Sequence, residues 1–101
     1  MANWCNNTIK IEGHACWMAA HEYVTLTFPT DFQVVSKDLF MVEFTCRTKW
    51  DPKLEILSGL CRKHNVTFNV KFDEFLCQLK GNVLVDTEGE VWDMDSRKKY
   101  E

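Results

Sequence analysis

The chain has few glycines and prolines and lacks the sequence motifs that mark a specialised chemistry. It holds 4 glycines and 2 prolines in 101 residues, and no glycine-rich phosphate loop, repeat, linker or low-complexity segment stands out. Its length fits one compact domain, and a hydrophobic fraction of 46% supplies a core without metal or disulfide support. We therefore predict a single domain over residues 1–101, with a charged and frayed tail at 96–101.

The charge balance lacks a basic excess. The chain contains 12 Lys and Arg residues and 15 Asp and Glu residues, which gives a net charge of −3. A protein that binds the phosphate backbone needs a cation for each phosphate it neutralises. The composition therefore argues against a general nucleic-acid binder, and leaves only a small basic edge at Arg47 and Lys49 near Trp50.

The cysteines lack the spacing of a disulfide framework or a zinc site. They are five in number, and no two form a C-x-x-C pair; they are Cys5, Cys16, Cys46, Cys61 and Cys77. Cys16 and His21 could share a metal on a helix, but no further ligands accompany them. We predict reduced thiols that pack as small core residues, with no metal and no cofactor.

The chain also lacks the signals of export or membrane insertion. The first residues hold no basic region followed by an apolar run, and no apolar stretch approaches about 18 residues. The expected location is the cytoplasm, without membrane contact.

Periodicity predicts alternating strands and helices. Phe40, Val42, Phe44 and Cys46 share one face of a strand, and we expect that face to lie beneath a helix. The expected strands are 8–12, 32–35, 39–46, 66–72, 76–86 and 90–94, with a short helix at 15–23, a hairpin turn at 36–38 and a turn at 87–89.

The strongest local signal is a second helix. Asp51 is the expected N-cap and Pro52 the first helical residue. Apolar residues recur every three or four positions from Leu54 to His64, and Asn65 can close the helix. A strand, a helix and a strand in this order indicate a crossover between parallel neighbours. The predicted class is α+β, a mixed and mainly antiparallel sheet with one long and one short helix on one face.

Three segments resemble a known family. They are Met1-Ala2-Asn3-Trp4-Cys5-Asn6-Asn7 continuing to Gly13, then Phe44 to Pro52, then Phe72-Asp73-Glu74 with Gly81. Together they resemble the YubB-type ferredoxin-like family of phages and conjugative plasmids. The resemblance implies a ferredoxin-like fold and a mobile-element origin, and it provides no catalytic residues to transfer.

Catalysis is not indicated by the residues. Asp73 with Glu74, and Asp93 with Asp95, are paired carboxylates that we interpret as solvated turns or edges. The cysteines and histidines show no local nucleophile signature. We therefore do not expect an enzyme.

Binding through an exposed surface is the stronger interpretation. Trp4 and Trp50 belong to the family pattern and are expected to fill the core or cover its margin, whereas Trp17 and Trp92 fall outside that pattern. Tryptophan is a common anchor at protein interfaces. Trp92 is surrounded by acidic residues, and the predicted partner-binding residues are Trp92, Asp86, Glu88, Glu90, Asp93 and Asp95.

The functional hypothesis is a small phage or plasmid protein that binds and inhibits a host protein. A nucleic-acid-handling defence complex such as CRISPR–Cas is the suggested target, blocked sterically or by an acidic strand that engages a basic groove. The alternative is an RNA- or DNA-binding module that uses the open face of the sheet. The oligomeric state is left open, because an exposed edge strand can also pair with itself.

Overall fold

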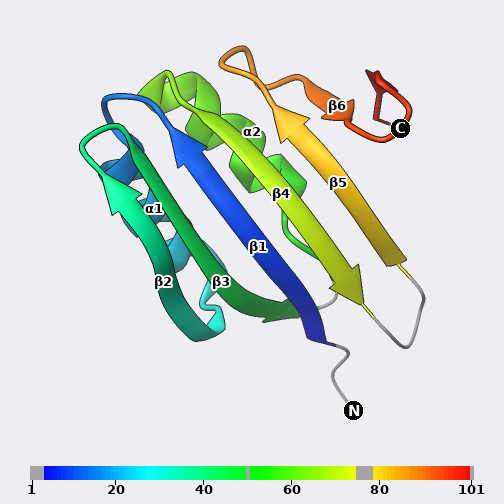
Figure 1. Ribbon diagram of the computed structural model, residues 1–101, viewed down its shortest axis with the longest axis horizontal. Helices are drawn as coiled ribbons and strands as arrows, with labels where there is room; N and C mark the ends of the chain where they lie inside the picture. The colour runs from blue at the N-terminus through cyan, green and yellow to red at the C-terminus, as the bar shows by residue number, and fades with distance from the viewer. Residues whose placement is uncertain (1–3, 50, 75–78, 101) are drawn as a thin grey trace.

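The computed structural model describes residues 4–49, 51–74 and 79–100, which form a seven-stranded sheet and two helices (Figure 1). The strands are β1 (Trp4–Glu12), β2 (Thr30–Asp38), β3 (Met41–Lys49), β4 (Thr67–Glu74), β5 (Leu79–Val85), β6 (Val91–Asp93) and β7 (Lys98–Lys99). The helices are α1 (Cys16–Thr27) and α2 (Leu54–His64). Neither helix is long and apolar enough to cross a membrane, as far as the described residues go.

The strand order is β2-β3-β1-β4-β5-β6-β7, and each neighbouring pair is antiparallel. The first six elements alternate as β1-α1-β2-β3-α2-β4, which is the ferredoxin-like arrangement with both helices on one face (Figure 1). The prediction that α2 joins parallel neighbours is wrong. Strands β3 and β4 point the same way, but β1 lies between them and pairs with both.

Helix α1 is longer than the sequence suggested. It was expected over 15–23 and runs over Cys16–Thr27, so the two helices have nearly equal length, 12 and 11 residues. Phe28 ends it in the left-handed conformation, with φ of 48° and its N–H donated to the Val24 carbonyl at 3.0 Å. This is the closure that glycine usually supplies, and here it leaves Phe28 81% exposed.

The predicted hairpin is present, with strands longer than expected, but its turn lies at residues 39–40 because the predicted turn at 36–38 is part of β2 and pairs with β3. Phe44 lies on the buried face of β3 as predicted, but the same prediction for Phe40 is wrong. Phe40 belongs to the turn between β2 and β3 and is exposed, and its ring lies against the His14 ring with 4.7 Å between centroids. Alternation fails at Phe40 because strand geometry stops at the turn.

Helix α2 begins later than predicted. Asp51 is not the N-cap: Lys53 holds that position in the left-handed conformation, and no side chain caps the helix. The Asp51 carboxylate instead accepts the Lys53 N–H at 2.8 Å, which closes a turn before the helix. The other end agrees with the prediction, because Asn65 ends the helix in the left-handed conformation after Arg62, Lys63 and His64.

The C-terminal strands extend the sheet beyond the ferredoxin-like core. The expected strand at 76–86 is seen as β5, and its positions 76–78 lie outside the described residues. The tail was expected to be frayed, yet β7 pairs with β6, and Tyr100 donates its N–H to the Val91 carbonyl at 2.9 Å. The Tyr100 side chain packs against the core, and this apolar contact explains the order of the tail.

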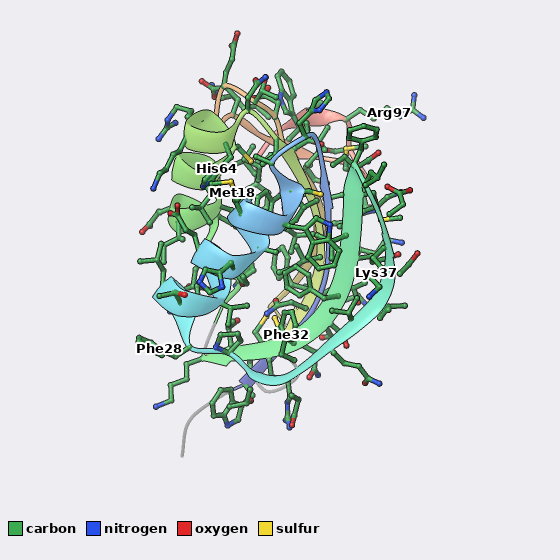
Figure 2. The ribbon with its side chains drawn as sticks, turned by 90° about the vertical axis from the view of Figure 1, so that its left-hand side faces the viewer. Met18, Phe28, Phe32, Lys37, His64 and Arg97 are labelled. Atoms are coloured by element: carbon green, nitrogen blue, oxygen red, sulfur yellow. The ribbon has the colours of Figure 1, made fainter. Side chains whose placement is uncertain are left out.

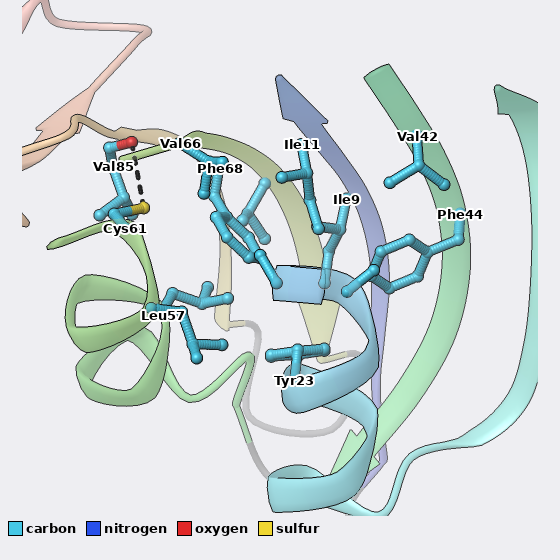
Figure 3. Packing of buried hydrophobic residues seen from close by; sticks show 14 of the residues in the cluster. Ile9, Ile11, Tyr23, Val42, Phe44, Leu57, Cys61, Val66, Phe68 and Val85 are labelled. Carbon is cyan, nitrogen blue, oxygen red and sulfur yellow. Dashed lines mark hydrogen bonds between the residues drawn. The ribbon is translucent and has the colours of Figure 1, made fainter. Parts of the chain in front are cut away.

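The core lies between the sheet and the helices (Figure 3). Tyr23 of α1 reaches Phe44 and Phe68, with ring centroids 6.1 and 6.3 Å apart. Within β1 one polar residue is buried, and its amide is satisfied: Asn7 donates to the Thr48 hydroxyl at 2.8 Å and accepts from the Cys5 thiol at 3.3 Å. The core residues are Cys5, Ile9, Ile11, Cys16, Ala19, Ala20, Tyr23, Val42, Phe44, Cys46, Leu57, Leu60, Cys61, Val66, Phe68, Val70, Phe72, Val83 and Val85.

Candidate partner-binding surface

Asp86, the first of the predicted contact residues, builds the turn that precedes β6. One carboxylate oxygen accepts the N–H groups of Glu88 and Glu90, each at 3.0 Å, and the other accepts the Trp92 indole N–H at 2.9 Å. These bonds, the indole bond foremost, lower the pKa of the Asp86 carboxyl. Its hydrogen-bonding capacity is therefore directed into its own chain.

The other predicted contact residues divide into engaged and exposed groups. Glu90 forms an ion pair with Lys99 at 2.7 Å, and Asp93 accepts the N–H of Asp95 at 2.9 Å. Glu88 and Asp95 have exposed side chains. The structure thus brings the six residues into one region, but three of its five carboxylates stabilise the local fold, and Lys99 offsets part of the acidity.

Trp92 lies on the open face of the sheet, opposite the helices. It pairs with Leu84 of β5 and Lys99 of β7, and directly opposed residues in an antiparallel ladder share a face. Its side chain is 40% exposed. The indole N–H is taken by Asp86, so the ring itself is what this residue offers to a partner.

The rest of the open face is a mosaic of both charges. Opposed or ion-paired residues on the face and its margins are Lys10 with Glu43, Asp73 with Lys80, Arg47 with Asp31, and Glu90 with Lys99. The Lys49 ammonium lies 5.9 Å from the Trp4 ring centroid. Over the described part of this face the cations thus alternate with acids, which does not favour binding to a phosphate backbone.

A larger surface, which the sequence reasoning missed, lies along α1 and β2 (Figure 2). Helix α1 carries large apolar residues on its outer side as well as its buried side, together with the polar His21, Glu22 and Thr25. It buries Cys16, Ala19, Ala20 and Tyr23 against the sheet, while Trp17, Met18 and Leu26 are 44, 63 and 53% exposed. Large apolar side chains that gather outside the core can mark a contact with another molecule.

Strand β2 continues this surface at the edge of the sheet. All nine of its residues are exposed, and they include Phe32, Val34 and Val35. Its pairing with β3 is irregular at two places, between Thr30 and Gln33 and between Val34 and Ser36. Such bulges interrupt the regular hydrogen-bonding edge that another strand would extend. This edge therefore offers apolar side chains more than backbone groups.

A groove of about 240 Å³ separates α1 from β2. Its lining is almost entirely apolar: Trp17, Ala20, His21, Val24, Phe32, Val34 and Val42. The Trp17 indole N–H donates to the Asp38 carbonyl at 3.3 Å, and the Lys37 ammonium lies 6.0 Å from the ring centroid. These contacts hold Trp17 across from β2 and fix one wall of the groove.

We define the α1/β2 surface by its seven exposed apolar residues: Trp17, Met18, Leu26, Phe28, Phe32, Val34 and Val35. Side chains of this size expose about 150–250 Å² when free, and the measured fractions therefore leave roughly 800 Å² exposed. The largest apolar patch of a typical monomer is about 300–600 Å². That range refers to one continuous patch, whereas the seven residues are distributed over α1 and β2 with the exposed His21 and Thr25 among them. The groove joins Trp17 of α1 to Phe32 and Val34 of β2, and the α1/β2 surface is the strongest candidate for a contact with another macromolecule.

The thiols and histidines do not form a reactive centre in the described residues. Cys5, Cys16, Cys46 and Cys61 are buried and free, as predicted, and Cys77 lies outside the description. Burial raises the pKa of Cys5 and Cys46 to about 11 and that of Cys61 to about 12. The described chain contains no cluster of ligands suited to a metal.

One of the two carboxylate pairs differs from the expectation of solvated turns or edges. Glu74 is 2% exposed, whereas its neighbour Asp73 faces solvent, because successive residues of β4 point to opposite faces. Asp93 and Asp95 agree with the expectation: the Asp93 carboxylate accepts the backbone N–H of Asp95 in a turn, and Asp95 is exposed. His64, in the last turn of α2, lies 3.0 Å from the Glu22 carboxylate, which also binds Lys63 at 2.7 Å. This cluster joins α1 to α2.

Comparison with known proteins gave one family. The profile described as "Ferredoxin-like domain in Api92-like protein" matches residues 21–100. Neither the curated proteins nor the solved structures gave a significant match.

Proposed function

The chain belongs to the family of ferredoxin-like domains found in Api92-like proteins, and we propose that it is a YubB-type protein of phage or plasmid origin that binds and inhibits a host protein. The proposed main contact is the α1/β2 surface. Inhibition is steric: the domain occupies a surface that the host protein needs. The resemblance of Met1 to Gly13 to the YubB-type N-terminus supports the proposed origin.

The observation that carries this proposal is the outer face of α1. Trp17, Met18 and Leu26 face solvent from a helix whose other side fills the core. At about 25 cal/mol per Å², burying roughly 800 Å² of apolar surface would contribute on the order of 20 kcal/mol before the costs of association. A protein partner of ordinary interface size covers about this area.

The suggested target class is a nucleic-acid-handling defence complex, of which CRISPR–Cas is one example. The exposed carboxylates of Glu88 and Asp95 support an accessory contact with a basic groove in such a complex. Trp92, with its exposed ring, is the proposed centre of that accessory contact. In this arrangement the apolar surface supplies most of the binding affinity, and the acidic turn speeds association by electrostatic attraction to the basic groove.

The test is affinity capture of the tagged chain from bacterial host cells after nuclease treatment, followed by mass spectrometry and reconstitution with the purified partner. Met18→Glu and Val35→Glu place a charge in the α1/β2 surface at positions 63 and 60% exposed. We expect each to weaken binding at least tenfold while leaving the unfolding midpoint nearly unchanged. The reconstituted partner should lose its activity in the presence of the unmodified chain.

Glu88→Lys is the control, because it changes the charge by two units, more than either surface variant, at an exposed position on the acidic turn. It should slow association and leave most of the affinity. Binding that survives both apolar-surface variants and fails in Glu88→Lys would move the main contact to the acidic turn. Capture of nucleic acid alone would replace the proposal with the nucleic-acid alternative.

A further inference from the structure

The α1/β2 surface raises the question of what covers it when no target is present. Its seven apolar residues are exposed to different extents, and Phe28, Met18 and Val35 are the most exposed of them, at 81, 63 and 60%. We propose that a second copy of this chain covers the α1/β2 surface in the free protein, so that target binding competes with self-association. This inference rests on the proposed function, because it assigns an occupant to the same surface.

The area is the first argument for a second copy. A stable interface of standard size buries about 800 Å² on each partner. The exposed residues of α1 and β2 together offer an area of this order, and Met18, Phe28 and Phe32 among them are labelled in Figure 2. A two-fold dimer uses the same patch on both chains, so one such surface is sufficient.

The charge of the surface is the second argument. A chain with a net charge of −3 repels its own copies, unless they meet where charge is low. The charged groups bordering the groove are largely compensated within the chain: Asp31 binds Arg47 at 3.2 Å, and Glu22 binds Lys63 at 2.7 Å. The Lys37 ammonium lies over the Trp17 ring. Two copies can therefore meet here without like charges in opposition.

The shape of the surface favours side-chain packing over a continuous sheet. The two bulges of β2 interrupt the edge that a ladder would need. The groove lined by Trp17, Phe32 and Val34 is open, and it can receive an apolar side chain such as Met18 or Leu26 of the second copy. The proposed contact is an isologous packing of α1 and β2 against the same elements of the partner.

Sedimentation velocity of the purified full chain over a wide concentration range tests this inference. We expect a reversible monomer–dimer equilibrium, with Met18→Glu and Val35→Glu each shifted at least tenfold toward monomer. Glu88→Lys should keep the dimer, and circular dichroism should show that all variants are folded. Adding the purified target should convert the dimer to a one-to-one complex.

The outcomes separate this inference from the proposed function. A chain that stays monomeric at every concentration overturns the second copy, while loss of target binding in Met18→Glu would still support the proposed function. A dimer that persists in both surface variants also overturns the inference, because another surface must then hold it. Assemblies whose size keeps increasing with protein concentration would exclude a closed two-fold dimer.

Discussion

Gly81 and Gly59 allow a paired test of the packing, because the same substitution should have opposite effects at the two positions. Gly81 lies on β5 directly opposite Phe72 of β4. A Cβ added at Gly81 would lie 2.7 Å from Cζ and 2.9 Å from Cε1 of the Phe72 ring. The ring is 4% exposed and belongs to the core, so it has little room to move away.

The expected magnitudes follow from these distances. Overpacking of a filled core costs about 1–3 kcal/mol, and the lower entropy of the unfolded alanine chain returns about 0.4–1 kcal/mol. Gly81→Ala should therefore lower the free energy of unfolding by about 1–2 kcal/mol. Gly59 lies within α2, and its added Cβ meets no atom within 4 Å. Gly59→Ala should raise the free energy of unfolding by about 1 kcal/mol, because alanine has a higher helix propensity than glycine.

Urea unfolding followed by circular dichroism measures both values. The urea midpoint of Gly81→Ala should fall and that of Gly59→Ala should rise. The m value, the dependence of the unfolding free energy on urea concentration, should be the same in both variants and the parent. Phe72→Leu combined with Gly81→Ala should recover part of the loss, which a double-mutant cycle detects as coupling of at least 0.5 kcal/mol. A Gly81→Ala protein as stable as the parent would refute the close packing of Phe72 on β5.

Three further predictions concern buried or hydrogen-bonded groups. Because the bonds from Trp92 and the turn lower the pKa of Asp86, their stabilisation is present above the unfolded value of about 3.9 and is lost as pH falls through the folded pKa. The indole N–H resonance of Trp92 should shift in that range, and Asp86→Asn should abolish the titration. Asn7→Ala removes the bond to the Thr48 hydroxyl and should cost about 2–3 kcal/mol in urea unfolding, whereas a loss below about 0.5 kcal/mol would contradict the buried network. Burial should protect four thiols from iodoacetamide at pH 8 until the chain unfolds, which peptide mass spectrometry can check at Cys5, Cys16, Cys46 and Cys61; rapid labelling of the folded chain would contradict it.

Local chemistry made much of the fold predictable. The stripe from Leu54 to His64 and the closing Asn65 located α2, and alternation located β4. Both signals are local, since they depend on residues within a few positions of each other. Strand order is not local: sequence spacing alone did not show that β1 lies between β3 and β4.

The candidate site was harder to predict, because it depends on what each side chain contacts. Acidic residues around Trp92 suggested a contact surface, but a sequence does not show that Asp86 accepts three hydrogen bonds from its own chain. The signal for the α1/β2 surface was present in the sequence. Trp17 and Met18 fall outside the buried stripe of α1, and two large apolar residues on the outer side of the predicted helix at 15–23 indicate a second contact.

The most direct test of the central claim is amide hydrogen exchange of the chain, free and bound to its captured partner. Contact through the α1/β2 surface predicts that binding slows exchange of unpaired or weakly protected amides along β2 and at the ends of α1. Protection confined to the 86–95 segment, or spread over the open face of the sheet, would contradict the account.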